Sequence, residues 1–274
     1  MEPSRLVLIG SAASKAMSPR LWNPVFQELG LGWTYDAWDV PAGGDLDEVR
    51  RRLLAPGIVA ANVTMPHKHW AAETADEATD PVLLSGACNL LVRKGTRLVG
   101  HNTDISALTA LLGGQYQRHA LLLGAGGAAR AAMIALEGHL GTVSITDRDP
   151  HAAAELLDLA RERGMDARTV SWQQGQELSA DASLIVNATP IGKSMSDGPA
   201  WGDGPLAPDA VVYDFVYARH TTASVARARG MGVRCIDGWE HLREQAVAMV
   251  PLLGLDGQSG RLLKETLERI RAAS

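Results

Sequence analysis

Lys68 is the first residue whose setting in the sequence suggests chemistry. It follows an apolar, strand-like run, 57–61, and the turn-forming residues Asn-Val-Thr-Met-Pro-His. Pro66 lacks a backbone donor and biases the residue before it toward an extended conformation, so this segment is expected to be a loop at the end of a strand. A lysine there is either a solvated charge, the commoner case, or a group aimed into a cleft where it can carry a proton.

A glycine-rich turn is the strongest local signal. Residues 120–130 read ALLLGAGGAAR, in which Gly124, Gly126 and Ala129 satisfy the dinucleotide-binding pattern G-x-G-x-x-G/A. The pattern alone is weak evidence, but here a strand-like run precedes it and a helix-like run follows it. Small residues let a pyrophosphate approach the backbone, and the helix N-terminus offers it N–H groups. The expected contacts are Gly124, Ala125, Gly126, Gly127 and Ala128.

Asp147 ends the next strand-like run, 143–146, about 20 residues beyond the glycines. A carboxylate there can accept hydrogen bonds from the adenosine ribose hydroxyls. It would repel a 2′-phosphate by about 4 kcal/mol per pair of unit charges at about 4 Å and an effective dielectric near 20. We therefore expect NAD, with NADP less favoured; Arg148, expected at the same site, is the one feature that favours NADP. Asp149 before Pro150 is expected to cap a helix.

The elements that must position these residues alternate along the chain. Strand-like runs lie at 6–9, 57–61, 120–123, 143–146, 184–186 and 211–213, and helix-like stretches include 128–138 and 152–163. This alternation predicts the α/β class, with parallel sheets covered by helices, and the Gly/Pro-rich stretch 195–208 is predicted to be a surface loop. Asn187, Ala188 and Thr189 follow one of the runs, at the carboxyl edge where open parallel sheets bind ligands, so we expect them to contact the cofactor.

Composition bounds the class of protein. The chain has 274 residues, enough for two domains, and a net charge of -5 without a basic block, so we expect no nucleic-acid partner. No apolar run approaches the roughly 20 residues of a membrane span, and the N-terminal run is too short for a signal peptide. We expect a cytoplasmic protein with no membrane partner. Cys88 and Cys235 belong to no Cys/His cluster, which predicts buried thiols and no metal site.

Several further motifs accompany these residues. SGACNL at 85–90 and GHNTD at 100–104 follow the lysine loop, and NATPIG at 187–192, DFVY at 214–217 and GWEHLREQ at 238–245 follow the glycine-rich turn. In order and spacing, over nearly the whole chain, the set resembles the shikimate dehydrogenase family. The resemblance implies two domains: an N-terminal α/β substrate domain, 1–105, completed by 238–274, and an inserted Rossmann-like dinucleotide-binding domain, 106–237.

The resemblance also implies a reaction. It is the reversible hydride transfer between a nicotinamide cofactor and a small cyclic hydroxy acid, interconverting 3-dehydroshikimate and shikimate or a close analogue such as quinate or aminoshikimate. By this resemblance Lys68 and Asp104 are the catalytic pair at the reacting oxygen. An alcohol loses hydride only as its oxygen loses a proton, so a positioned proton carrier is needed. The implied substrate contacts are Ser18, Asn62, Thr64, Asn89, Tyr217 and Gln245, and Gly238 joins the cofactor contacts.

The chain departs from the family pattern in the loop 10–23. The family has a His-Ser-x-Ser-Pro run whose two serine hydroxyls hold the substrate carboxylate, whereas this chain keeps Ser18 but has Lys15 and Ala16 before it. A hydrogen bond to a charged group is worth about 1.5 to 3 kcal/mol, so an ordinary carboxylate would bind roughly 10-fold to 150-fold more weakly. Either the charge of Lys15 compensates or the substrate differs at that end; Ser14 is also close in sequence.

Other interpretations remain open. A cofactor-binding regulatory or degenerate module with little turnover would keep the fold but has no need of Lys68 and Asp104. Another lysine-dependent dehydrogenase, of the methylene-tetrahydrofolate type, is disfavoured by Asn-Val-Thr-x-Pro-x-Lys together with Asn-Thr-Asp.

In the cofactor half, Asp-Arg-Asp at 147–149 and Ala152 replace the basic signature for NADP. Monomer and homodimer are both compatible with the sequence.

Overall fold

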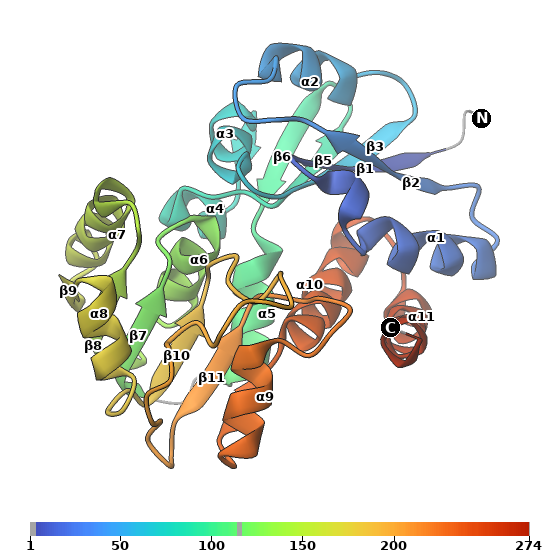
Figure 1. The fold of residues 1–274 in the computed structure, drawn as a ribbon. Helices are drawn as coiled ribbons and strands as arrows, with labels where there is room; N and C mark the ends of the chain where they lie inside the picture. Colours follow the sequence, from blue (N-terminus) through green and yellow to red (C-terminus); the bar gives the residue numbers. More distant parts are fainter. Residues whose placement is uncertain (1–3, 114–116, 274) are drawn as a thin grey trace. The chain divides into compact units, whose positions relative to one another are not determined.

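The chain forms two compact units, each built on a six-stranded sheet covered by helices (Figure 1). In this computed structural model the structure describes residues 4–113 and 117–273. The first unit runs to Thr103 and resumes from Gln245 to Ala273, and the second spans Asp104–Glu244. The predicted α/β class with two domains is confirmed. The domain limits at 105 and 238 stay a prediction.

The sheet of the first unit has the order β2-β1-β3-β5-β6-β4. Its elements are β1 (Arg5–Gly10), the 3-10 helix η1 (Ala13–Lys15), α1 (Ser18–Glu28), β2 (Thr34–Asp39), α2 (Leu46–Leu53), β3 (Ile58–Val63), α3 (Lys68–Thr74), β4 (Glu77–Ala78), α4 (Asp80–Ser85), β5 (Leu90–Lys94), β6 (Arg97–His101) and α11 (Gly257–Ala272). β1 lies parallel to β2 and β3, but β5 is antiparallel to both β3 and β6. The prediction of a parallel sheet therefore holds for β1, β2 and β3 and is wrong for β5, so this sheet is mixed. Gly95, with a φ of 65°, turns the chain between β5 and β6.

The sheet of the second unit is fully parallel, in the order β12-β11-β10-β7-β8-β9. Its elements are α5 (Thr103–Leu112), β7 (Gln117–Leu123), α6 (Gly127–Ala135), β8 (Leu140–Thr146), α7 (Pro150–Glu162), β9 (Asp166–Thr169), α8 (Trp172–Leu178), β10 (Leu184–Asn187), β11 (Val211–Asp214), α9 (Ala223–Gly230), β12 (Arg234–Ile236) and α10 (Gly238–Leu252), whose last residues belong to the first unit. The chain runs outward from β7 in one direction and then from β10 in the other. This is the Rossmann arrangement, which binds ligands beyond the carboxyl ends of the strands where the order reverses.

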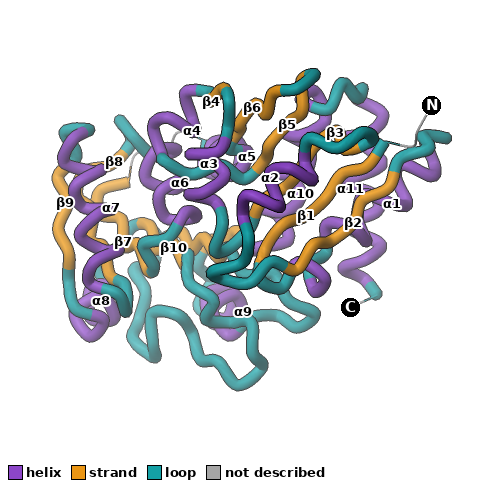
Figure 2. Tube along the Cα trace, turned by 90° about the horizontal axis from the view of Figure 1, so that it is seen from above, coloured by secondary structure: helices purple, strands orange, loops and turns teal. Residues whose placement is uncertain are grey.

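The predicted elements match the observed ones closely in type. Each of the six strand-like runs coincides with a strand, and the two helix-like stretches coincide with α6 and α7. The stretch 195–208 contains neither helix nor strand, as predicted, and it lies in the long loop after β10 (Figure 2). Asp149 caps α7 as expected, because its side chain accepts the His151 N–H at 2.9 Å.

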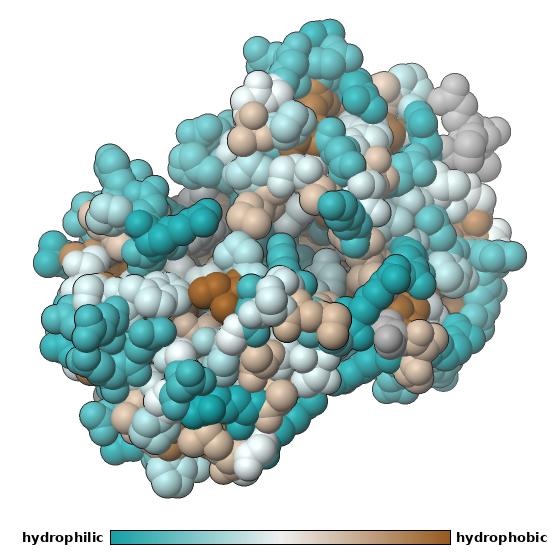
Figure 3. All heavy atoms as spheres, viewed as in Figure 1, coloured by the Kyte–Doolittle hydropathy of each residue, from teal (hydrophilic) through white to brown (hydrophobic). Residues whose placement is uncertain are grey.

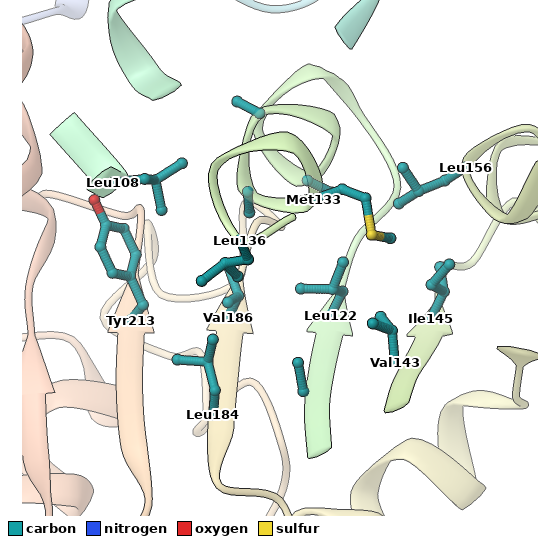
Figure 4. Packing of buried hydrophobic residues seen from close by; sticks show 14 of the residues in the cluster. Leu108, Leu122, Met133, Leu136, Val143, Ile145, Leu156, Leu184, Val186 and Tyr213 are labelled. Atoms are coloured by element: carbon teal, nitrogen blue, oxygen red, sulfur yellow. The ribbon is translucent and has the colours of Figure 1, made fainter. Parts of the chain in front are cut away.

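The second unit is held together by an aliphatic core between its sheet and α5, α6 and α7 (Figure 4). Burying each large side chain of this kind contributes about 1.5 to 3 kcal/mol. The strand residues Leu122, Val143, Ile145, Leu184 and Val186 are at most 1% exposed, and the helix residues packed on them include Leu108, Met133, Leu136 and Leu156. The carboxyl ends of β7, β8 and β10, where the predicted cofactor residues lie, are therefore on a rigid frame.

Hydrophobic residues are scattered over the face of the molecule drawn in Figure 3. They form small, separate spots there among hydrophilic side chains. The large exposed hydrophobic residues are Met65, Leu83, Met195 and Met231. Over the described residues, none of the helices combines the length and the apolar character that crossing a membrane requires.

Candidate active site

Lys68 is the first residue of α3, at the end of the loop that follows β3. The loop is tied to β1, because the Thr64 N–H donates to the Ile9 carbonyl at 2.8 Å, and His67 bonds the Val40 carbonyl through Nε2 at 2.8 Å. The Lys68 carbonyl accepts the N–H of Cys88 at 2.9 Å. The half-buried lysine thus follows a loop that three hydrogen bonds hold in place, two through the backbone and one through the His67 side chain.

Asn62 and Asn89, both predicted to bind substrate, are buried in one hydrogen-bond network. The Asn62 side chain accepts the Tyr35 hydroxyl at 2.5 Å and donates to the Asn89 carbonyl at 3.2 Å. Asn89 Oδ1 accepts the Thr103 N–H at 2.8 Å, which fixes the residue before Asp104. The network therefore joins β3, the segment that carries Asn89 and the residue before Asp104, and it gives the two asparagines a structural role.

In the loop after β1, Ser14 is close in sequence to the missing serine hydroxyl, but its side chain bonds Asp39. The hydroxyl of Ser14 donates to Asp39 Oδ2 at 2.6 Å, and its N–H donates to Asp39 Oδ1 at 2.8 Å. These two bonds are the main reason why the pKa of Asp39 lies below its ordinary value. Lys15 is exposed, and Ala16 and Ser18 are half-buried. Because its hydroxyl hydrogen goes to Asp39, Ser14 is a poor replacement for the missing serine.

Asp104, the second predicted catalytic residue, lies in the first turn of α5 and is 2% exposed. His241 in α10 approaches it, with Nε2 at 3.2 Å from Asp104 Oδ1. The other ring nitrogen of His241 lies 2.6 Å from the hydroxyl of Tyr213 in β11. Tyr217 follows β11 and lies near Trp239, with ring centroids 6.0 Å apart.

The glycine-rich loop lies where the strand order reverses, between the ends of β7 and β10. Gly124 has a φ of 98°, and a Cβ there would lie 2.9 Å from the Ala188 carbonyl oxygen, so only glycine allows these two loops to approach. A Cβ on Gly126 would meet nothing within 4 Å, so space remains beside that residue. α6 begins at Gly127 and presents its positive end to this space. The arrangement fits a dinucleotide pyrophosphate.

Asp147 lies directly beside this loop. Its Oδ2 accepts the Ala125 N–H at 2.7 Å, and its Oδ1 accepts the Asp149 N–H at 2.8 Å. The carboxylate is therefore held next to the glycines, which is the place expected of a ribose-binding residue. Arg148 is exposed.

Asn187 shapes the loop after β10 through its side chain. Oδ1 accepts both the N–H and the hydroxyl of Thr189, at 3.1 and 2.6 Å, and Nδ2 donates to Ile191 and Asp214 at 2.9 and 2.8 Å. Asn187 is fully buried. In this part of the predicted cofactor site, Ala188 and Thr189 are the residues placed beside Gly124.

Gly238, also predicted at the cofactor site, begins α10. A Cβ at this position would lie 2.4 Å from the Val216 carbonyl group, so a side chain would clash with backbone. Asp237 precedes it and caps the helix, accepting the Glu240 N–H at 3.0 Å, and Glu240 accepts the Asp237 N–H at 3.0 Å. Gly238 thus allows α10 to begin against the chain that follows β11.

His241, Tyr213 and Asp39 were not among the site residues predicted from the sequence. His241 belongs to the motif GWEHLREQ, and an ionisable residue in that motif was the available signal. Tyr213 and Asp39 lie at or near the end of a strand. Their partners, His241 and Ser14, are distant in sequence, so the contacts could not be predicted. Ser18 and Gln245 lie on α1 and α10. No group of three or more metal-ligating side chains occurs among the residues that the structure describes.

Strand order and the glycine-rich loop together define a dinucleotide-binding α/β protein, and known proteins resemble the whole chain. The model of the shikimate dehydrogenase substrate binding domain matches residues 8–91. A shikimate dehydrogenase (NADP(+)) of Pelobacter propionicus is 35% identical over an alignment of 257 residues, and the match covers 89% of this chain and 88% of that protein. The chain belongs to the shikimate dehydrogenase family and is an oxidoreductase.

Solved structures agree over the full length. Shikimate 5-dehydrogenase of Thermus thermophilus, in complex with NADP(H) and shikimate, is 29% identical with a TM-score of 0.79 and covers 97% of this chain and 99% of its own. Quinate dehydrogenase of Corynebacterium glutamicum, in complex with NAD, is 27% identical with a TM-score of 0.83, with coverage of 97% and 99%. The predicted family is thereby confirmed, and members with either cofactor are similar to this chain.

Proposed function

We propose that this protein interconverts a cyclic hydroxy acid and its ketone, shikimate and 3-dehydroshikimate or a close analogue, with a nicotinamide cofactor. The observation that carries the proposal is the network through Asn62, Asn89 and Thr103, which fixes the chain beside the predicted site residues of the first unit and ends at the residue before Asp104. Assays with shikimate, quinate and aminoshikimate, each with NAD and NADP, test it. Turnover of at least one supports the proposal, and cofactor binding without turnover of any would favour a regulatory module.

Lys68 and Asp104 are the proposed catalytic pair at the reacting oxygen. During oxidation, the Lys68 amine takes the proton of the substrate hydroxyl, and during reduction it returns that proton to the same oxygen. The Asp104 carboxylate accepts a hydrogen bond at the reacting centre. The proposed substrate contacts are Ser18, Asn62, Thr64, Asn89, Tyr217 and Gln245.

The glycine-rich loop would hold the cofactor. Its backbone from Gly124 to Ala128, with the N-terminus of α6, suits the pyrophosphate, and Ala188 and Thr189 lie beside Gly124. Nicotinamide, when bound, accepts or supplies the hydride. The close approach of Gly124 to Ala188 supports this assignment, because it places the loops after β7 and β10 side by side at the predicted cofactor site.

Cofactor choice is proposed to favour NAD. Asp147 is held beside the glycine-rich loop by the N–H groups of Ala125 and Asp149, so its charge would face a 2′-phosphate at close range. We expect kcat/KM to be higher with NAD than with NADP, and Asp147→Asn to narrow the difference by removing repulsion while keeping one oxygen. Steady-state kinetics with both cofactors measures this.

Asp158→Asn is the matched control, because Asp158 is exposed on α7 and lies outside the loop. It should leave the NAD to NADP ratio unchanged. A preference of about tenfold or more for NADP in the unmodified enzyme would contradict the proposal, and would align this chain with the relatives named for NADP(+).

Substrate binding near the altered loop is tested by Ala16→Ser. Ala16 ends η1 with an extended backbone, two residues before the proposed contact Ser18. A restored hydroxyl should lower KM for shikimate, by about 10-fold, with little change in kcat, because the bond forms in both the ground and transition states. Steady-state kinetics with shikimate measures this.

Lys15→His combined with Ala16→Ser rebuilds the whole His-Ser-x-Ser run and separates two explanations. If Lys15 already pairs with the carboxylate, the hydroxyl adds nothing until the lysine is removed. If KM for shikimate fails to fall in either variant while another polyol acid is turned over well by the unmodified enzyme, shikimate is not the natural substrate. The altered loop would then determine specificity.

A further inference from the structure

His241 forms a buried hydrogen-bonded chain with Asp104 and Tyr213. Its Nε2 lies 3.2 Å from Asp104 Oδ1, and its Nδ1 lies 2.6 Å from the Tyr213 hydroxyl. The three residues are 4%, 2% and 0% exposed. Buried ionisable groups need partners, because an unpaired one loses its hydration without compensation. The three side chains satisfy one another, although they come from α10, α5 and β11.

The imidazole ring of His241 is fixed from several sides. It packs against Phe215, with ring centroids 4.5 Å apart, and against the Tyr213 ring at 5.9 Å in an edge-on arrangement. Tyr213 belongs to the same core cluster as Leu108, four residues after Asp104 in α5 (Figure 4). The capped start of α10 fixes the backbone three residues earlier. Rotation of the ring is therefore restricted.

Tyr213 determines which ring nitrogen of His241 carries the proton. Burial, and next the charge of Asp104, raise the pKa of Tyr213 far above its ordinary value, so the phenol keeps its proton. A phenol O–H donates to the nearest acceptor, which is Nδ1. Nε2 then carries the ring proton and donates a hydrogen bond to Asp104 Oδ1.

We propose that His241 is a positioning residue for Asp104, with Tyr213 fixing its tautomer. A ring N–H on Oδ1 sets the plane of the carboxylate, and thereby the direction in which Asp104 meets the reacting oxygen. The inference rests on the proposed function, in which Asp104 belongs to the catalytic pair. Because misplacement of a catalytic group by about 1 Å can cost on the order of 100-fold in rate, the effect should appear in kcat.

His241→Leu should lower kcat about 10-fold to 100-fold, with little change in KM or in cofactor affinity. His241→Gln should recover most of this loss, because an amide N–H can reach the position of Nε2–H. His119→Leu is the control, since His119 lies in the same unit but bonds Ser144 at 3.0 Å, and it should keep the unmodified kcat. Equal losses in the Leu and Gln variants would overturn the inference.

A double-mutant cycle with Asp104→Asn separates positioning from loss of fold. If His241 acts through Asp104, adding His241→Leu to Asp104→Asn should cost less than about twofold more. Multiplied losses would overturn the inference, and so would a large loss for Asp104→Asn with none for His241→Leu. Near-normal activity of Asp104→Asn would instead refute the proposed role of Asp104, and the inference with it.

Nitrogen-15 NMR of labelled histidine tests the tautomer in the unmodified enzyme without any activity measurement. Nε2 of His241 should carry a proton, and Nδ1 should be unprotonated. Tyr213→Phe removes the donor to Nδ1, so it should shift protons toward Nδ1 and lower kcat in the same direction as His241→Leu. A ring protonated at Nδ1 in the unmodified enzyme would overturn the inference.

Discussion

Replacing Lys68 by alanine is expected to lower kcat at least 100-fold, and up to about 10,000-fold, because the proton carrier at the reacting oxygen is lost. The loop itself should survive, since the alanine variant keeps its bonds through Thr64, His67 and the backbone of residue 68. Affinity for NAD should stay nearly unchanged, because the glycine-rich loop belongs to the other unit. Turnover and calorimetric titration of NAD on the same preparation measure both quantities.

Lys94→Ala is the matched control for this experiment. Lys94 is exposed in the hairpin of β5 and β6, in the same unit as Lys68. It should keep kcat and NAD affinity. If Lys68→Ala lowers kcat by less than about fivefold, Lys68 is a solvated charge, and the regulatory interpretation of the chain gains in weight.

Much of the fold was predictable because buried parallel strands are continuous apolar runs. The runs at β1, β3, β7, β8, β10 and β11 were found for this reason. β5 was not found, although Leu90, Leu91 and Val92 are buried. Its antiparallel direction depends on the turn that follows it, which an apolar run does not reveal. Lys94-Gly-Thr-Arg97 was the available hairpin signal, and a single glycine in a polar stretch also fits an ordinary loop.

The candidate site was predictable where function depends on local sequence. The glycine-rich loop and the cap at Asp149 need only neighbouring residues, and both were assigned from the sequence. Partners of side chains were not predictable, because they are distant along the chain: Asp104 meets His241, and Ser14 meets Asp39. A sequence without its fold shows that a histidine exists, but it does not show which carboxylate that histidine approaches.

Asp214 is expected to make the free energy of unfolding fall as pH rises through weak acid. Burial raises the pKa of this fully buried carboxyl from 3.8 to about 6, although Val216, Thr222 and Asn187 all donate hydrogen bonds to it and oppose the shift. The folded state therefore binds the proton more tightly than the unfolded chain. The contribution of Asp214 to the free energy of unfolding is fully present below about pH 4 and is lost by about pH 6. The total is roughly 3 kcal/mol, because one pKa unit corresponds to about 1.36 kcal/mol.

Asp214→Asn isolates this contribution because an asparagine resembles the protonated acid and does not titrate. Its oxygen can accept from Val216 and Asn187 as Oδ1 does, and its amide can donate to the Thr222 hydroxyl. Chemical denaturation of both proteins should show the unmodified chain losing roughly 2 kcal/mol relative to the variant between about pH 4.5 and about pH 7.5.

Asp197→Asn is the control with the opposite sign. Asp197 is half-buried, and backbone N–H groups of Gly192 and Ser194 lower the pKa of its carboxyl, so its contribution to the free energy of unfolding is complete above about pH 4 and is lost only in stronger acid. The difference in the free energy of unfolding between this variant and the unmodified chain should not change with pH between about pH 4.5 and about pH 7.5. A flat difference for Asp214→Asn as well would mean that Asp214 is ionised throughout, held by its three donors against the cost of burial.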